Sequence, residues 1–187
     1  MDKTNKILLI ACGILIFLVS AWQIVSYMSY IPIKVANNNN DTYFIDGVSF
    51  KSPVNWTVYT SNVDGDKIID INKNKLDYPY FQIQITSNPT DESDQDAINE
   101  IQNSSDPDES SCTTLISNNT LTIDNETAYE TTSIINDYTK FNQTMKEEDI
   151  NLVKNGKTYF MYFLAQNNEF NNENPNIDLI INSLKVR

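Results

Sequence analysis

Three consecutive acids, Glu147, Glu148 and Asp149, are the side chains whose spacing points most directly to chemistry. Two carboxylates that face the same sugar can hydrolyse a glycosidic bond, one acting as the acid and the other as nucleophile or base. These acids lie in a stretch with strand-like sequence, residues 146–153, where neighbouring side chains point to opposite faces. The sequence therefore favours a solvated strand edge here over a catalytic pair.

Two other acidic clusters could offer oxygen ligands to calcium: Asp64, Asp66 and Asp70 form the first, and Asp106, Asp108 and Glu109 form the second. The EF-hand pattern fails at the first cluster, because the terminal bidentate glutamate is missing. The second cluster lies in a polar stretch, 103–111, that is interrupted by proline and typical of a soluble loop. We therefore expect a turn and a loop at these places, and no metal site.

The sequence contains no histidine. This removes the commonest general base, the commonest zinc ligand and every catalytic triad built on imidazole. We therefore expect a protein that is not an enzyme, with no catalytic residue, no metal and no cofactor. An enzyme of the cell envelope that uses paired carboxylates is the alternative.

Residues 7–33 form an apolar segment that carries no charged side chain over roughly 25 residues. This length is enough for a helix to cross a hydrocarbon core of about 30 Å. Lys3 and Lys6 precede the segment, so the positive-inside rule puts the N-terminus in the cytoplasm. A signal peptide cleaved near residues 19–21 and a lipoprotein acylated at Cys12 are two alternatives. The apolar stretch continues well past both places, which favours a retained anchor.

This topology predicts four regions. Residues 1–6 are cytoplasmic, 7–33 form a transmembrane signal-anchor helix, 34–41 form a linker and 42–187 form one extracytoplasmic domain. Cys12 and Cys112 then lie in different compartments and cannot form a disulfide with each other.

The chain is strongly acidic, with 25 Asp and Glu against 13 Lys and Arg and a net charge of −12. An acidic surface repels phosphate backbones, so nucleic-acid binding is disfavoured. We expect two partners: the lipid bilayer, through the N-terminal helix, and another protein of the envelope.

Alternating apolar and polar residues predict strands along most of the outer region. The dipeptides Asp46-Gly47 and Asn155-Gly156 predict two β-hairpins. The clearest strands are expected at 80–87 and 157–166, and the second has apolar residues on both faces, so both faces should be covered. Further short strands are expected at 42–45, 48–52, 56–60, 67–72, 112–117, 120–123, 127–135 and 146–153.

Two helices are expected to provide that cover. Ser93 and Asp96 have the spacing of a capping box at the start of a short amphipathic helix. Asn174 and Pro175 are expected to cap and start the last helix. Its apolar stripe consists of Ile177, Ile180, Ile181 and Leu184. The expected fold class is therefore α+β, with helices packed on an antiparallel sheet.

Five stretches of the outer region carry a resemblance to a known family: 46–53 (DGVSFKSP) with Trp56, 125–130 (NETAYE), 155–159 (NGKTY), Phe170 and 180–185 (IINSLK). In this order they resemble the PsbP-like family, which is named after an extrinsic subunit of the photosynthetic oxygen-evolving complex. The resemblance implies an α/β/α sandwich around a central antiparallel sheet. It also implies a binding or assembly protein without a catalytic centre.

Two surface features remain. Aromatic residues in 76–80 (LDYPY) could form a partner-binding patch, although packing at a strand end explains them as well. N-glycosylation sequons begin at Asn40, Asn55, Asn103, Asn118, Asn125 and Asn142. An outward topology would allow some of them to carry glycans.

The sequence as a whole predicts a single-pass membrane protein that displays a non-catalytic PsbP-like domain outside the cell. This domain would bind or scaffold another envelope component. A passive, glycosylated component of the cell surface is a further alternative.

Overall fold

The computed structural model describes residues 33–35, 42–73, 78–88, 93–104, 112–136, 141 and 143–187. Nearly all of the predicted anchor, 7–33, and most of the predicted linker, 34–41, lie outside these residues. The two residues at their junction form a short strand, β1 (Ile33–Lys34), which pairs with β4. No helix in the described part of the chain has the length and apolarity that a membrane span requires.

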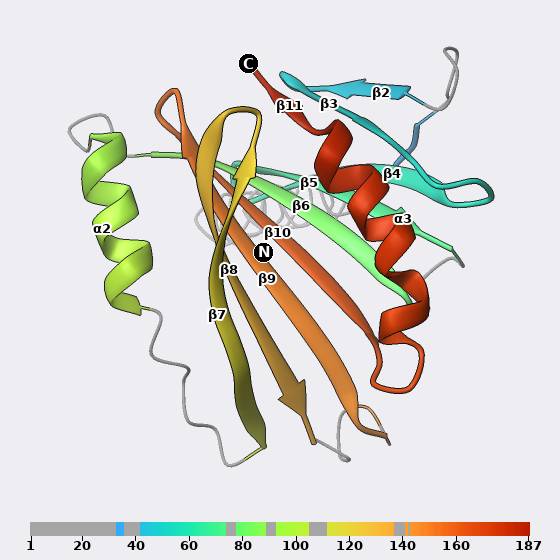
Figure 1. Ribbon diagram of the computed structural model, residues 1–187. Helices are drawn as coiled ribbons and strands as arrows, with labels where there is room; N and C mark the ends of the chain where they lie inside the picture. Colours follow the sequence, from blue (N-terminus) through green and yellow to red (C-terminus); the bar gives the residue numbers. More distant parts are fainter. Residues whose placement is uncertain are drawn as a thin grey trace, which may run out of the picture.

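An eight-stranded antiparallel sheet forms the body of the molecule (Figure 1). Its strands are, in spatial order, β1, β4 (Thr57–Val63), β5 (Asp66–Asn72), β6 (Tyr80–Ser87), β10 (Lys157–Gln166), β9 (Met145–Lys154), β8 (Glu126–Ile135) and β7 (Thr113–Ile123). The pairing of β6 with β10 joins two meanders, β4–β6 and β7–β10, in which each strand pairs with its neighbour in the sequence.

The predicted hairpins are present, and their turn residues explain them. Asp46 and Gly47 both have positive φ angles, 46° and 84°, as do Asn155 and Gly156, with 57° and 70°. Positive φ at both central residues defines the tight turn whose twist matches that of paired strands, and asparagine, aspartate and glycine tolerate this conformation best. The first turn joins β2 (Thr42–Ile45) to β3 (Val48–Lys51), and the second joins β9 to β10.

A second, three-stranded sheet and the helix α3 (Phe170–Ser183) lie over one face of the large sheet (Figure 1). The small sheet has the order β11 (Lys185–Val186), β3, β2. Its inner side chains Val48, Phe50 and Val186 are buried. They join the apolar face of the large sheet and the α3 residues Ile177 and Ile180 in one core. This burial of aliphatic and aromatic area is the main stabilising contribution to the fold.

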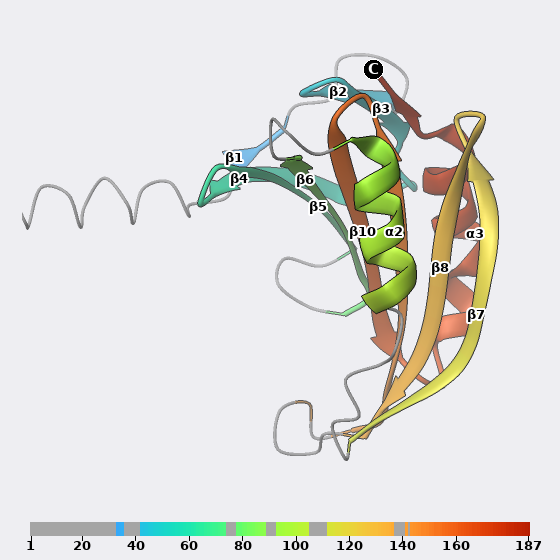
Figure 2. The ribbon, with the colours of Figure 1, turned by 90° about the vertical axis from the view of Figure 1, so that its left-hand side faces the viewer.

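The helix α2 (Asp94–Ser104) lies on the opposite face of the large sheet (Figure 2). Its predicted capping box is confirmed. The Ser93 backbone N–H donates to Asp96 Oδ2 at 3.1 Å, and the Asp96 backbone N–H donates to Ser93 Oγ at 3.2 Å. These bonds satisfy donors that the first helical turn leaves free.

The predicted fold class, α+β with an α/β/α sandwich, is wrong, and the transmembrane helix predicted before it lies almost wholly outside the described residues. The described residues form eleven strands and two helices, so the structure is mostly β. The reason is geometric. A helix of the length of α3 extends about 21 Å, whereas eight strands span roughly 34 Å. One helix cannot cover that sheet, and the three-stranded sheet covers much of what α3 leaves open.

Two element boundaries also differ from the prediction. The segments 112–117 and 120–123 belong to one long strand, β7, whose register with β8 shifts between Leu115 and Ser117. The last helix begins at Phe170, so Pro175 lies inside it. Phe170 is buried, and its ring centroid is 4.7 Å from that of Phe163. This packing holds a helical turn ahead of the proline and outweighs the hydrogen bond that proline cannot donate.

Candidate functional site

The large-sheet face on the side of α2 carries a cluster that we name the tyrosine–carboxylate face: Asp70 of β5, Tyr80 of β6, Tyr162 of β10, and Glu147 and Asp149 of β9. The strand register brings them together. Tyr162 is paired with Asp149 on one side and with Gln82 on the other, and Gln82 is paired with Asp70. Glu147 and Asp149 are two residues apart in a strand and therefore share a face.

A continuous chain of aromatic rings crosses this face. Tyr80 lies between Tyr78 and Tyr162, with ring centroids 5.8 Å and 5.6 Å away. The chain continues to Phe160, 6.3 Å from Tyr162, and to Phe141, 5.9 Å from Tyr78. All five rings are half-buried. The aromatic segment predicted at 76–80 thus joins a larger aromatic surface, and these contacts favour its packing role.

Burial and nearby charges change the pKa values of ionisable groups on this face. Burial, followed by the charge of Glu147 and the hydrogen bond with it, raises the pKa of Asp149 to about 8. No described group donates a hydrogen bond to Asp149 Oδ1, which is buried. Burial also raises the pKa of Tyr80 to about 12, against the effect of its hydrogen bond with Tyr162. Asp149 therefore holds a proton at neutral pH.

Glu148 faces the other way, toward α3. Burial, followed by the charge of Glu130 and the hydrogen bond with it, raises the pKa of Glu148 to about 7. Lys146, on the same face of β9, places its Nζ 4.3 Å from the centre of the Phe170 ring. The three adjacent acids thus divide between two faces, as alternation in a strand requires.

The expectation of a solvated strand edge at these acids is wrong. The strand β9 lies between β8 and β10 inside the sheet, and Glu147, Glu148 and Asp149 are all half-buried. The sequence shows alternation but not which strand lies beside which, so it could not reveal that β9 is central. A half-buried pair of acids that shares a proton can donate and accept protons, which is the chemistry of a general acid.

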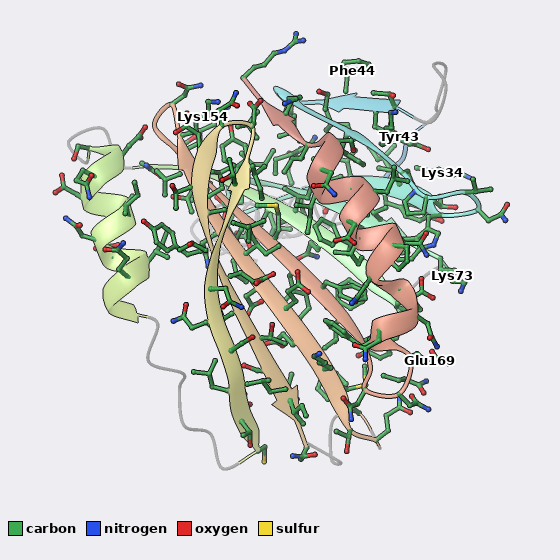
Figure 3. The ribbon with its side chains drawn as sticks, viewed as in Figure 1. Lys34, Tyr43, Phe44, Lys73, Lys154 and Glu169 are labelled. Carbon is green, nitrogen blue, oxygen red and sulfur yellow. The ribbon has the colours of Figure 1, made fainter. Side chains whose placement is uncertain are left out.

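A different kind of surface covers the outer face of the three-stranded sheet. Strand alternation directs Phe44, Ser49, Lys51, Lys185 and Arg187 away from the core. Phe44 is paired with Ser49 across β2 and β3, and Ser49 is paired with Lys185 across β3 and β11. We name these five residues the basic outer face. Figure 3 shows Phe44 on the outer side of β2, with Tyr43 on the opposite side.

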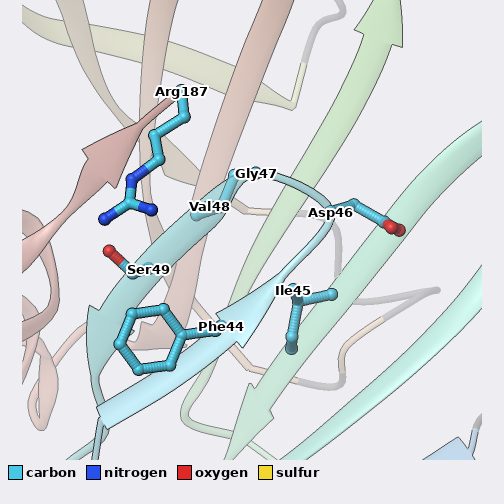
Figure 4. A pocket seen from close by; sticks show the side chains of 7 residues that line it. All are labelled: Phe44, Ile45, Asp46, Gly47, Val48, Ser49 and Arg187. Atoms are coloured by element: carbon cyan, nitrogen blue, oxygen red, sulfur yellow. The ribbon is translucent and has the colours of Figure 1, made fainter.

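The basic outer face includes a hollow of about 210 Å³ that is lined by the hairpin residues 44–49 and by Arg187. In Figure 4 the guanidinium group of Arg187 is directed toward the Ser49 side chain, and the Phe44 ring lies on the same side. Asp46 points away from them, and its carboxylate forms an ion pair with Lys67 at 3.1 Å. The acid that lines the hollow is thus already neutralised, whereas no ion pair within the described residues includes Arg187.

One half-buried acid, Asp124, contacts the strand that carries part of the basic outer face. Asp124, in the turn between β7 and β8, binds Lys185 and Lys154 at 3.1 Å each and accepts a hydrogen bond from the Val186 backbone N–H. Burial alone would raise the pKa of Asp124. These three partners outweigh that effect and lower the pKa to about 2. Asp124 thereby ties β11 to the large sheet and fixes the position of the basic outer face.

The acidic clusters considered for calcium do not assemble into a site in the described residues. Asp66 and Asp70 accept hydrogen bonds from Gln84 and Gln82, at 2.6 Å and 2.7 Å. Asp64 lies in the turn between β4 and β5, with a φ of 51°. The second cluster, 106–109, lies outside the described residues. No group of three or more potential metal ligands occurs in the part of the chain that the structure describes.

The sequons differ in accessibility. Asn55, Asn118 and Asn125 are exposed, and Asn55 and Asn125 have positive φ angles of 67° and 66°. Asn103 lies near the end of α2, while Asn40 and Asn142 lie outside the described residues. The three sequons whose asparagine side chains are described are therefore all accessible to glycosylation.

Neither the basic outer face nor the pairing of Glu147 with Asp149 was predicted from the sequence. The basic outer face depends on β11, a strand of two residues that carries no hydropathy signal of its own. The alternation of Ser49 with Phe50 and of Lys185 with Val186 was a usable signal, but only once these residues were known to be strands.

Comparisons with known proteins identify the fold. No family model and no curated protein matches the sequence. Among the solved structures, the cyanobacterial PsbP (CyanoP) of Synechocystis is similar with a TM-score of 0.52 at 12% identity, over 82% of this chain and 98% of that chain. A protein from Bacteroides thetaiotaomicron is similar with a TM-score of 0.50 at 10% identity, over 79% of this chain. The match spans about half of the Bacteroides protein, 48%. These similarities support a PsbP-like fold, and at such identities they show the fold alone.

Proposed function

We propose that the protein is a non-catalytic binding module of the cell envelope. In this proposal the apolar segment that precedes β1 anchors it in the membrane, the N-terminus is cytoplasmic, and residues 42–187 bind or scaffold another envelope component. The PsbP-like fold supports a binding role, because the resemblance to that family implies a binding or assembly protein.

The observation that carries the proposal is the basic outer face. The chain has a net charge of −12, yet Lys51, Lys185 and Arg187 gather on one side of a three-stranded sheet around an exposed Phe44. Phe44 has 63% of its surface exposed. Arginine and aromatic side chains are the residues most enriched where proteins bind one another. An exposed phenylalanine beside cations suits a surface that a partner covers.

Site-specific photo-crosslinking in intact cells tests this proposal. A photoreactive phenylalanine analogue at position 44 is expected to capture one neighbour repeatedly, which mass spectrometry then identifies. The same analogue at Ile116 is the control, because Ile116 is also exposed, at 51%, but lies on β7 at the far edge of the large sheet. Equal capture at both positions, or capture at neither, would remove the support for this binding surface.

A second candidate function rests on the tyrosine–carboxylate face. Glu147 and Asp149 share one face of the sheet, and the pKa of Asp149 is raised to about 8, as a general acid requires. Hydrolysis of cell-surface glycans, measured as new reducing ends, would support this function. The activity should then disappear in Glu147→Gln and Asp149→Asn variants whose circular dichroism spectra are unchanged.

A further inference from the structure

The hollow in the basic outer face has a size that restricts what it can hold. Its volume is about 210 Å³, which is smaller than the roughly 300 to 1,000 Å³ of typical small-molecule sites. A volume of this size suits one side chain of a larger partner. The hollow is therefore better matched to a protein segment than to a metabolite.

The polar groups in the hollow favour a carboxylate. The Arg187 guanidinium can bind a carboxylate through two parallel N–H donors, and the Ser49 hydroxyl beside it can donate a third hydrogen bond. Asp46 does not compete for Arg187, since it is paired with Lys67 at 3.1 Å. The Arg187 guanidinium and the Ser49 hydroxyl thus lie on one side of the hollow, where they can bind an anionic group of a partner.

Two features around the hollow further define the partner: the exposed ring of Phe44 and the charges close to the hollow. Phe44 is exposed beside it, so a partner gains free energy by covering the ring with an apolar group. The net charge of the whole chain opposes an acidic partner, but charges beyond about 8 Å are largely screened at physiological ionic strength. Within that range Asp124 is paired with Lys185 and Asp46 with Lys67, so Lys51 and Arg187 are the cations of the basic outer face that no ion pair of the described residues includes.

We propose that the partner of the basic outer face is a protein segment that presents a carboxylate next to an apolar side chain. The carboxylate occupies the hollow and binds Arg187 and Ser49, while the apolar side chain packs on Phe44. This inference rests on the proposed function and adds the chemistry of the partner to it.

Peptide binding to the full chain in phosphatidylcholine nanodiscs tests the inference. The probes are a fluorescent ten-residue peptide with one Glu-Leu pair in a Gly-Ser background and its Gln-Leu counterpart. We expect the Glu peptide to bind about tenfold more tightly than the Gln peptide, as one charge-assisted contact of this kind supplies. Arg187→Gln should abolish this difference, and Phe44→Ser should weaken both peptides.

Lys157→Gln is the matched control, because it removes the same charge from a residue that does not line the hollow. It should leave the tenfold difference unchanged. Equal binding of the two peptides would overturn the inference. So would Arg187-dependent co-sedimentation with phosphatidylglycerol vesicles in the absence of peptide binding, because the anion would then be a lipid phosphate.

The peptide experiment and the crosslinking experiment test different proposals, and each can fail while the other succeeds. If position 44 captures a neighbour in cells but the Glu peptide binds no better than the Gln peptide, the binding function stands and the carboxylate is wrong. If the Glu peptide binds through Arg187 but position 44 captures nothing in cells, the chemistry stands and the proposed envelope role is wrong.

Discussion

Replacing Asp149 with asparagine is expected to stabilise the folded protein, and to do so more at pH 7 than at pH 5. Burial and the neighbouring Glu147 raise the pKa of Asp149 from 3.8 to about 8 in the folded state. Between these two values the folded protein retains a proton that the unfolded chain has released. The free energy of unfolding of the wild type therefore falls as the pH rises through this window. Asparagine has no proton to lose, so it removes this contribution.

The size of the effect follows from the shift. Two pH units within the window correspond to an upper limit of about 2.7 kcal/mol, at 1.36 kcal/mol for each unit. Asp149 is only half-buried and is coupled to Glu147, so part of the penalty is relieved by water and by rearrangement of the pair. We expect about 1 kcal/mol as the extra stabilisation at pH 7 relative to pH 5.

Urea denaturation of the wild type and the variant at both pH values measures this difference. Contributions from other titrating groups, Glu148 among them, are present in both proteins and largely cancel. Glu100→Gln is the control, because it removes one charge from an exposed position on α2 and should not change the pH dependence. An Asp149→Asn variant that is destabilised equally at both pH values would show that Asp149 is ionised in the folded state.

Three further predictions address the rest of the fold and the topology. Asp124→Asn should cost about 1 kcal/mol at pH 7 because the charge that binds Lys154 and Lys185 is lost. Since the folded-state pKa of Asp124 is lowered to about 2, the stability of the wild type should fall from pH 4 to pH 2, and the variant should lack this part of the fall in urea titrations. Ile180→Ala should cost about 3 kcal/mol by the same measurement, and a loss under 1 kcal/mol would contradict the packing of α3. Protease added to intact cells should cleave the chain beyond residue 40, while cleavage only after lysis would place the domain inside.

The parts of the fold that could be predicted are those that neighbouring residues determine. The Asp46-Gly47 and Asn155-Gly156 turns follow from the backbone conformations that these residue types allow. The strands at 80–87 and 157–166 were predicted with their observed bounds, because two-residue alternation is a local signal. The capping box at Ser93 is local in the same way.

The parts that could not be predicted depend on contacts between distant residues. The strand β11 exists because Lys185 and Val186 pair with β3, more than 130 residues earlier in the chain. The early start of α3 depends on the packing of Phe170 against Phe163. Neither contact produces a pattern in the local sequence. The proportions of helix and strand were therefore predicted wrongly.

The prediction of the candidate sites was limited in the same way, because it also depended on contacts between distant residues. That Glu147 and Asp149 point to one side follows from alternation alone, but their burial follows from the position of β9 between β8 and β10. Burial, followed by the charge of Glu147, raises the pKa of Asp149 to about 8, so this acid is protonated at neutral pH. The sequence therefore supplied the residues of this face without the environment that gives them their chemistry.

In the β2–β3 hairpin, the inward side chains stabilise the fold, and the outward side chains are available for binding. Phe50 is completely buried, and its ring stacks on Tyr43 with centroids 5.7 Å apart. Phe44, on the paired strand, is turned outward with most of its surface in water. The turn and the inward residues Tyr43 and Phe50 hold the hairpin on the core, so the exposed ring of Phe44 adds little buried area to the fold. The ring is therefore available to a partner that packs beside Arg187.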